Sequence, residues 1–287
     1  MYMNSQVWQA LSGALGPLDE MQANFVSCEL EEGGLYLNWL PPVVELYCEG
    51  VPLGEEVVLH LWSQLHVKGI QCLSVCMDGK PVRLLGESPK VWGCQGSAQA
   101  WAGKRYFSWS GEGLIDGWQM DDSLLLSVLM PDLPGRTWLN LEPLDSLFSS
   151  AALSAGALHV VNVTGERWVQ DHLRDVHRFL GYRADRLSLV DQPMASCWSR
   201  LPKQLDIDGA VVRCHEMHGD VQRQAALALR RLEPVLVPEG ILALWGADES
   251  LPLPNLKRLL KREGPDFVYV DHVQQQGDFV LVLRYEP

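Results

Sequence analysis

The feature that most constrains the fold is a regular alternation of short β-branched runs with helical segments between Pro134 and Trp245. Strands are expected over 135–141, 159–163, 186–190, 209–212 and 240–245, and helices over 146–157, 165–180 and 221–232. Gly181 ends the second of these helices. Because strands that alternate with helices form a parallel sheet covered on both faces, the sequence predicts a doubly wound α/β domain.

The amino-terminal part predicts a different, α+β module. Helices are expected over 5–15 and 55–65, and strands over 35–40, 43–47, 72–77, 82–85, 91–94 and 106–110. These segments predict an antiparallel sheet with a helix. We therefore divide the chain into an α+β domain at 1–130 and a Rossmann-like α/β domain at 131–287.

Charge is unevenly distributed along the chain. Residues 1–135 carry 6 basic and 16 acidic side chains, and residues 136–287 carry 17 and 20. Because phosphate neutralisation supplies much of nucleic-acid affinity, this balance disfavours naked RNA as a partner. A local phosphate groove stays open as an alternative, built from Arg174, Arg178, Arg183 and Arg186, with Arg223, Arg230 and Arg231 elsewhere. Helix-surface arginines are more often simply solvated.

Cysteine usage and hydropathy indicate the compartment. The seven cysteines are odd in number and scattered without a CxxC pair, as in a reduced cytosolic protein. A signal-peptide pattern and an apolar run long enough to span a bilayer are both missing from the sequence, so we expect a soluble, cytoplasmic protein without a membrane partner. The first α/β turn lacks the glycines of a dinucleotide-binding dehydrogenase, and no G-x-S-x-G indicates a hydrolase.

Several short motifs resemble one family. Leu139-Asn140-Leu141 is similar to an L-N-L-F strand, Val221-Gln222-Arg223 to a V-Q-R helix, and 115–121 to a T-G-x-F-L-D segment. The closing strand at 276–283 also matches. On these residues the chain resembles the bacterial 23S ribosomal RNA methyltransferases, class I enzymes that use S-adenosylmethionine to modify cytosine C5 or guanine N7. The resemblance covers residues 35–287 and implies a class I methyltransferase domain preceded by that family's central domain.

The cofactor motifs depart from the family pattern. Leu144-Asp145-Ser146 replaces an aromatic-Thr-Gly turn whose backbone approaches the methionine part of the cofactor, and close approach needs a residue without a Cβ. Thr164 stands where an acid binds the ribose hydroxyls, whereas Asp191 matches the adenine-binding Asp. If cofactor binding is retained, the resemblance implies contacts from Asp191, Thr164, Asn140, Asp145 and Trp118.

The fourth strand lacks the family's catalytic motif. Arg213-Cys214-His215 replaces the Asp-Pro-Pro that positions the target base, so no catalytic residue is expected. Cys214 does not match the place of the family's nucleophile, and a free cysteine at a strand end is usually core filling. The segment 214–218 offers thiol and imidazole ligands, but its spacing matches no standard zinc site.

Two hypotheses follow for the whole chain. In the first, it is a degenerate methyltransferase that serves as a binding or scaffold protein, with a protein partner or a second copy. In the second, it is an active methyltransferase with altered cofactor contacts, acting on RNA or another substrate. The two lost contacts are each worth roughly 1–3 kcal/mol. Together they weaken the cofactor about a thousandfold, which favours the first hypothesis. Exposed tryptophans such as Trp92, Trp101 and Trp109 could stack on bases, but most tryptophans pack in cores.

Overall fold

The computed structural model describes residues 26–31, 34–50, 53–78, 80–95, 104–110, 113–114, 122–183, 185–204, 206–214, 220–247, 253–275 and 278–287. The expected helix at 5–15 lies outside these residues. The chain divides into two compact units, Met1–Ile115 and Asp116–Pro287, and each is described by itself. Among the described residues, none of the helices combines the length and the apolar character needed to cross a membrane.

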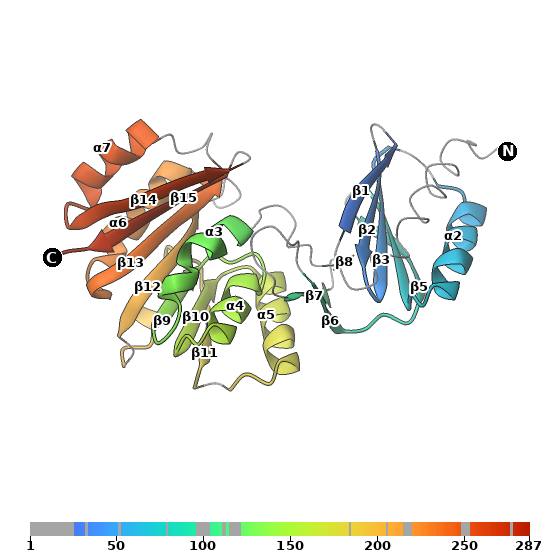
Figure 1. Ribbon diagram of the computed structural model, residues 1–287, viewed down its shortest axis with the longest axis horizontal. Helices are drawn as coiled ribbons and strands as arrows, with labels where there is room; N and C mark the ends of the chain where they lie inside the picture. Colours follow the sequence, from blue (N-terminus) through green and yellow to red (C-terminus); the bar gives the residue numbers. More distant parts are fainter. Residues whose placement is uncertain are drawn as a thin grey trace. The chain divides into compact units, whose positions relative to one another are not determined.

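Among its described residues, the first unit contains a five-stranded sheet and the helix α2 (Glu55–Val67) (Figure 1). The strand order is β1-β2-β3-β4-β5, for Val26–Glu31, Leu35–Leu40, Val43–Cys48, Cys72–Met77 and Lys80–Gly86. A second, three-stranded sheet contains β6 (Val91–Gln95), β7 (Lys104–Ser110) and β8 (Gly113–Leu114). Buried Leu37 and Leu46 of the larger sheet form a core with Leu61 and Leu65 of α2.

The expectation of an antiparallel sheet in this unit was wrong at one pair of strands. β3 and β4 run parallel, with Val43 opposite Cys72 and Cys48 opposite Met77. The reason is the helix between them: α2 carries the chain back across the sheet, and such a crossover returns the next strand in the same direction. The other three neighbouring pairs of the larger sheet are antiparallel.

The second unit is a seven-stranded sheet with helices on both faces, which confirms the doubly wound, mostly parallel architecture. Its strand order is β11-β10-β9-β12-β13-β15-β14. These strands span Leu187–Asp191, His159–Thr164, Thr137–Leu141, Ile207–Cys214, Leu236–Ala247, Asp278–Tyr285 and Phe267–Gln275 in that order. β9 to β13 are parallel, and β15 is antiparallel to both of its neighbours.

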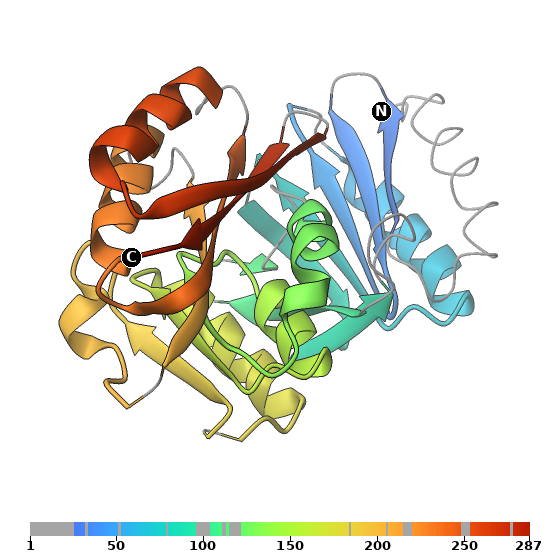
Figure 2. The same ribbon diagram turned by 60° about the vertical axis from the view of Figure 1, so that its left-hand side comes forward.

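The helices of this unit are α3 (Asp122–Leu129), α4 (Leu147–Ser154), α5 (Arg167–Phe179), α6 (Val221–Leu232) and α7 (Leu253–Glu263). α3, α4 and α5 cover one face of the sheet, and α6 and α7 cover the other (Figures 1 and 2). The division between the units precedes the boundary that we expected at residue 130. α3 therefore belongs to the second unit, where it packs against α4 and β15.

Close packing at the centre of the sheet requires a glycine at one position. Trp138 in β9 is fully buried and lies against Gly209 on the neighbouring β12. A Cβ at Gly209 would come within 2.5 Å of the Trp138 ring. The Trp138 ring thus occupies the space that a side chain at position 209 would take, and glycine is required there.

The strand order creates a switch point beside β9. The chain leaves β9 toward β10 on one side and reaches β12 on the other. In open α/β sheets, ligands bind in the crevice outside the carboxyl ends of the strands at such a point. The carboxyl edge around β9 is therefore the place to look for a site.

Candidate functional site

Five of the residues singled out from the sequence lie at or near this carboxyl edge. Thr164 ends β10, Asp191 ends β11 and Cys214 ends β12, whereas Asn140 lies within β9 and Asp145 in the turn that follows it. Thr164 and Asp191 are direct neighbours in the parallel register of β10 and β11. Trp118 lies outside the described residues.

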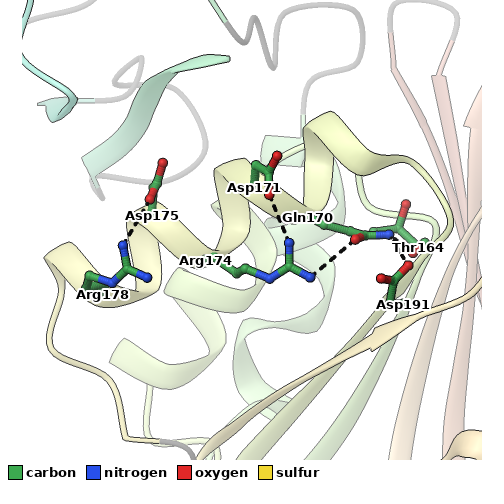
Figure 3. Close-up of polar contacts among 7 residues, drawn as sticks. All are labelled: Thr164, Gln170, Asp171, Arg174, Asp175, Arg178 and Asp191. Atoms are coloured by element: carbon green, nitrogen blue, oxygen red, sulfur yellow. Dashed lines mark hydrogen bonds and ion pairs between the residues drawn. The ribbon is translucent and has the colours of Figure 1, made fainter. Parts of the chain in front are cut away.

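A buried glutamine on α5 joins Thr164 to Asp191 (Figure 3). The Gln170 side-chain amide donates to Asp191 Oδ1 at 2.6 Å and to the Thr164 carbonyl at 3.0 Å. The Thr164 hydroxyl oxygen accepts from the Glu166 backbone N–H at 3.1 Å. The bond from Gln170 orients the Asp191 carboxylate, which is exposed and can still accept hydrogen bonds from a ligand.

The arginines proposed for a phosphate groove bind acceptors of the protein itself. On α5, Arg174 pairs with Asp171 at 2.9 Å and Arg178 with Asp175 at 3.4 Å (Figure 3). Arg183 pairs with Asp185 at 3.0 Å, and Arg186 donates to the carbonyls of Ala157 and Leu153. Each of the four cations is thus engaged inside the unit.

Asn140 and Asp145 make structural contacts. The Asn140 amide donates to Asn162 Oδ1 on β10 at 2.8 Å, which joins two neighbouring strands. Asp145 Oδ1 accepts from the Leu147 backbone N–H at 2.8 Å and so satisfies one of the free amides at the start of α4.

The described residues leave little space at the ends of β9, β12 and β13. A cavity of about 10 Å³ is left there, lined by Leu125, Asn140, Pro143, Leu144, Asp145, Phe148, Arg213 and Trp245. Arg213 is only 2% exposed, and its guanidinium carbon lies 4.0 Å from the centre of the Trp245 ring, in a cation–π contact. A cavity of this size holds at most about one water molecule.

A much larger cavity, of about 650 Å³, opens on the α6 side of the same edge. It is lined by Glu142, Glu166, Pro193, Met194, Ala195, Asp220, Arg223, Gln224, Leu227 and Arg230. Its volume lies within the range of small-molecule sites. The four described residues that we expected to contact a cofactor, Asp191, Thr164, Asn140 and Asp145, are not among the residues that line it.

Glu142 is the chemically distinctive residue of this larger cavity. It follows β9 directly, has a positive φ of 55° and is 5% exposed. One carboxylate oxygen accepts from the Met194 backbone N–H, and burial raises the pKa of the carboxyl. The sequence contained a signal for Glu142 as a distinctive residue, because this chain has Glu where the L-N-L-F strand of the similar family has Phe.

Cys214 is not an activated thiol. It is buried at the end of β12, and burial raises its pKa to about 12. A thiol with that pKa is protonated at neutral pH, and the thiolate is the nucleophile. The other residues of the segment 214–218 lie outside the described residues, and no group of three metal-ligating side chains occurs among those described.

Known proteins share this architecture. A family model described as S-adenosylmethionine-dependent methyltransferase matches residues 111–283. Among solved structures, "a putative SAM-dependent methyltransferase" from Streptococcus mutans is similar with a TM-score of 0.66 and 13% identity, over 99% of this chain and 83% of that one. The protein described as "SMU.776, a putative methyltransferase complexed with SAH" has a TM-score of 0.67 at 13% identity, with the same coverage.

A third similar structure is the SAM-dependent methyltransferase from Agrobacterium tumefaciens. Its TM-score is 0.54 at 14% identity, over 93% of this chain and 90% of that one. No curated protein matches the sequence. At these identities the structural likenesses establish the fold.

Proposed function

The chain belongs to the S-adenosylmethionine-dependent methyltransferase family, and from that premise we propose that it is a degenerate member that has lost methyl transfer and acts as a binding or scaffold protein. The observation that carries this proposal is the small size, about 10 Å³, of the cavity that the described residues leave at the ends of β9, β12 and β13. In the similar ribosomal RNA methyltransferases, the turn after the first strand approaches the methionine part of the cofactor. The matching turn here, Leu144-Asp145-Ser146, lines or adjoins a cavity of about 10 Å³.

The residues at this end do not fit the amino-acid part of S-adenosylmethionine. Leu144, Phe148 and Trp245 are buried and occupy the space. The cavity that they leave admits about one water molecule, whereas the methionine part of the cofactor contains several heavy atoms. Methyl transfer also requires the reacting atoms to be held about 3–3.5 Å apart and in line. The small cavity among the described residues is too small for that arrangement.

The positive charge of Arg213 opposes binding of S-adenosylmethionine, as the small size of the cavity does. The Arg213 guanidinium stands where the family has an Asp-Pro-Pro motif, and it is buried at the wall of the small cavity. The sulfonium of S-adenosylmethionine is also a cation. Like charges repel strongly where water is excluded, so a guanidinium at this wall opposes binding of the reactive group.

The larger cavity favours a second candidate function, an active methyltransferase with rearranged contacts. It opens at the same carboxyl edge, and the carboxylates of Glu142 and Glu166 line it. Carboxylates accept hydrogen bonds from sugar hydroxyls. Asp191, which matches the adenine-binding Asp of the similar methyltransferases, ends the neighbouring strand β11. In this candidate the cofactor would lie mainly on the α6 side.

Thermal unfolding with about 1 mM S-adenosylmethionine or S-adenosylhomocysteine separates the two candidates. A ligand at one hundred times its dissociation constant adds about 2.7 kcal/mol of stability. The scaffold proposal expects no shift of Tm, and also no transfer of a radioactive methyl group from the cofactor to total RNA. A clear shift that Asp191→Ala abolishes would contradict it and support the active enzyme.

A further inference from the structure

The outer surface of α6 and α7 carries a concentration of positive charge. The two helices contain seven Lys or Arg residues and one carboxylate, Glu263, although the whole chain has a net charge of −13. All seven cations are exposed, and the six in the last turn of α6 and in α7 form what we call the α6–α7 basic face: Arg230, Arg231, Lys257, Arg258, Lys261 and Arg262. α6 and α7 pack against each other, and Arg230 pairs with Glu263 across them at 3.2 Å.

Most cations of this face have no acid partner among the described residues. Arg230 and Arg262 share the single carboxylate of Glu263, and Arg258 donates to Asn255 Oδ1. Arg231, Lys257 and Lys261 make no ion pair with any described residue, which contrasts with the paired arginines of α5 (Figure 3). Within the part of the chain that the structure describes, most of the charge of the α6–α7 basic face is therefore not neutralised by an acid.

Helix stability alone does not account for the face. Cations in the last turn of a helix interact favourably with its dipole, and this explains Arg230, Arg231, Lys261 and Arg262. The dipole effect falls off within that turn. Lys257 and Arg258 lie a turn earlier and gain little from it.

We propose that the α6–α7 basic face binds the phosphate backbone of a nucleic acid. Lys and Arg side chains that neutralise phosphates supply sequence-independent affinity, and this face offers several of them on two adjoining helices. It lies on the face of the sheet opposite α3, α4 and α5 (Figure 2). The inference goes beyond the proposed function, because backbone binding requires neither cofactor nor methyl transfer.

The composition of the face favours nucleic acid over an acidic protein or a membrane. Stable protein interfaces are depleted in Lys and centre on aromatic or apolar anchors. The described side chains of α6 and α7 include no exposed large hydrophobic residue. A membrane-surface helix must expose an apolar face, but Leu256, Leu259 and Leu260 of α7 are buried in the core.

The test measures how binding depends on salt. A fluorescent single-stranded RNA of about 20 nucleotides is titrated with the full chain between about 0.05 and 0.3 M salt. Lys257→Gln/Lys261→Gln should weaken binding about tenfold at low salt and lower the slope of log affinity against log salt by about 1.4. The matched control, Arg178→Gln/Arg183→Gln, removes two side chains that are 75% and 80% exposed but paired, and should change neither quantity.

Each other outcome would overturn the inference. Equal effects of the two double variants would show that net charge, and not this face, controls binding. No RNA binding by the wild type would eliminate the proposal while leaving the scaffold function untouched. Polyglutamate or phosphatidylglycerol vesicles that bind as tightly as RNA would identify an acidic protein or a lipid surface instead. Equal Tm values for all variants establish that they are folded.

Discussion

At the scale of single residues, the replaced catalytic position is the most informative. The sequence predicted that Arg213 could not act as the family's Asp, but it could not predict where the guanidinium would lie. The structure buries it against Trp245, beside the turn that follows β9. That location depends on three strands that are distant in the sequence, so no local pattern reveals it.

Arg213→Ala should lower the free energy of unfolding by about 2–4 kcal/mol, because it removes the cation–π contact and leaves a cavity in the core. Urea denaturation measures the loss. Arg178→Ala, at an exposed ion pair, should cost less than about 1 kcal/mol. Equal losses in the two variants would contradict the burial of Arg213.

Two buried histidines should make stability depend on pH. Burial lowers the pKa of His172 to about 4 and that of His177 to about 3. An unfolded histidine has a pKa of about 6.5, so below that pH the unfolded chain binds more protons. Each histidine should therefore destabilise the fold increasingly as pH falls from about 6.5 toward 4, by up to about 1.4 kcal/mol per pH unit.

The measurement compares wild type with His177→Gln by urea unfolding between about pH 7.5 and pH 5. The comparison is needed because Glu45 and Glu142, whose pKa values burial raises, act in the opposite sense over part of this range. The variant should lose less stability on acidification than the wild type. Parallel pH profiles would show that His177 is not buried in its neutral form.

At the scale of elements, the sequence predicted strongly patterned segments well. β2, β4 and α6 begin and end at the expected residues. The expectations did not include β1, α3, α7 or β14. β14 is an edge strand with Val268, Tyr269 and Val270 all exposed, so it lacks the alternation that identifies a half-buried strand. In α7 the buried core leucines among the described side chains are Leu256, Leu259 and Leu260, and Pro254 lies near its start.

Gly209→Ala should destabilise the second unit by about 1–3 kcal/mol, because the added methyl group overlaps Trp138 in a filled core. Urea unfolding followed by far-UV circular dichroism measures the change. Combining it with Trp138→Phe should recover part of the loss, since the smaller ring leaves room for the methyl group. Strictly additive losses in the double variant would show that the two residues do not compete for space.

At the scale of the whole molecule, the carboxyl edge was predictable and the cavities were not. The alternating patterns predict a parallel sheet, and in a parallel sheet the carboxyl ends of the strands share one edge. The observed register places Thr164 and Asp191 side by side at that edge. The cavities depend on packing between distant segments. Between β11 and β12 the described chain forms only a short helical turn, Cys197–Arg200, and the larger cavity lies between the loop after β11 and α6.

The two units should unfold as separable transitions, because each has its own sheet and its own buried core. Leu46→Ala in the first unit should shift one calorimetric transition, and Gly209→Ala should shift the other. A single transition that both variants shift equally would show that the units unfold cooperatively.

The position of β15 between β13 and β14 has a consequence for synthesis on the ribosome. β14 emerges before β15, yet β15 is its only partner among the described strands of the sheet. Until β15 has left the exit tunnel, β14 has no strand to bond to, and β13 exposes the backbone groups that β15 will cover. The nascent sheet should therefore grow outward from β9 and close this side last, which makes β13 and β14 the natural contact sites for a chaperone during translation.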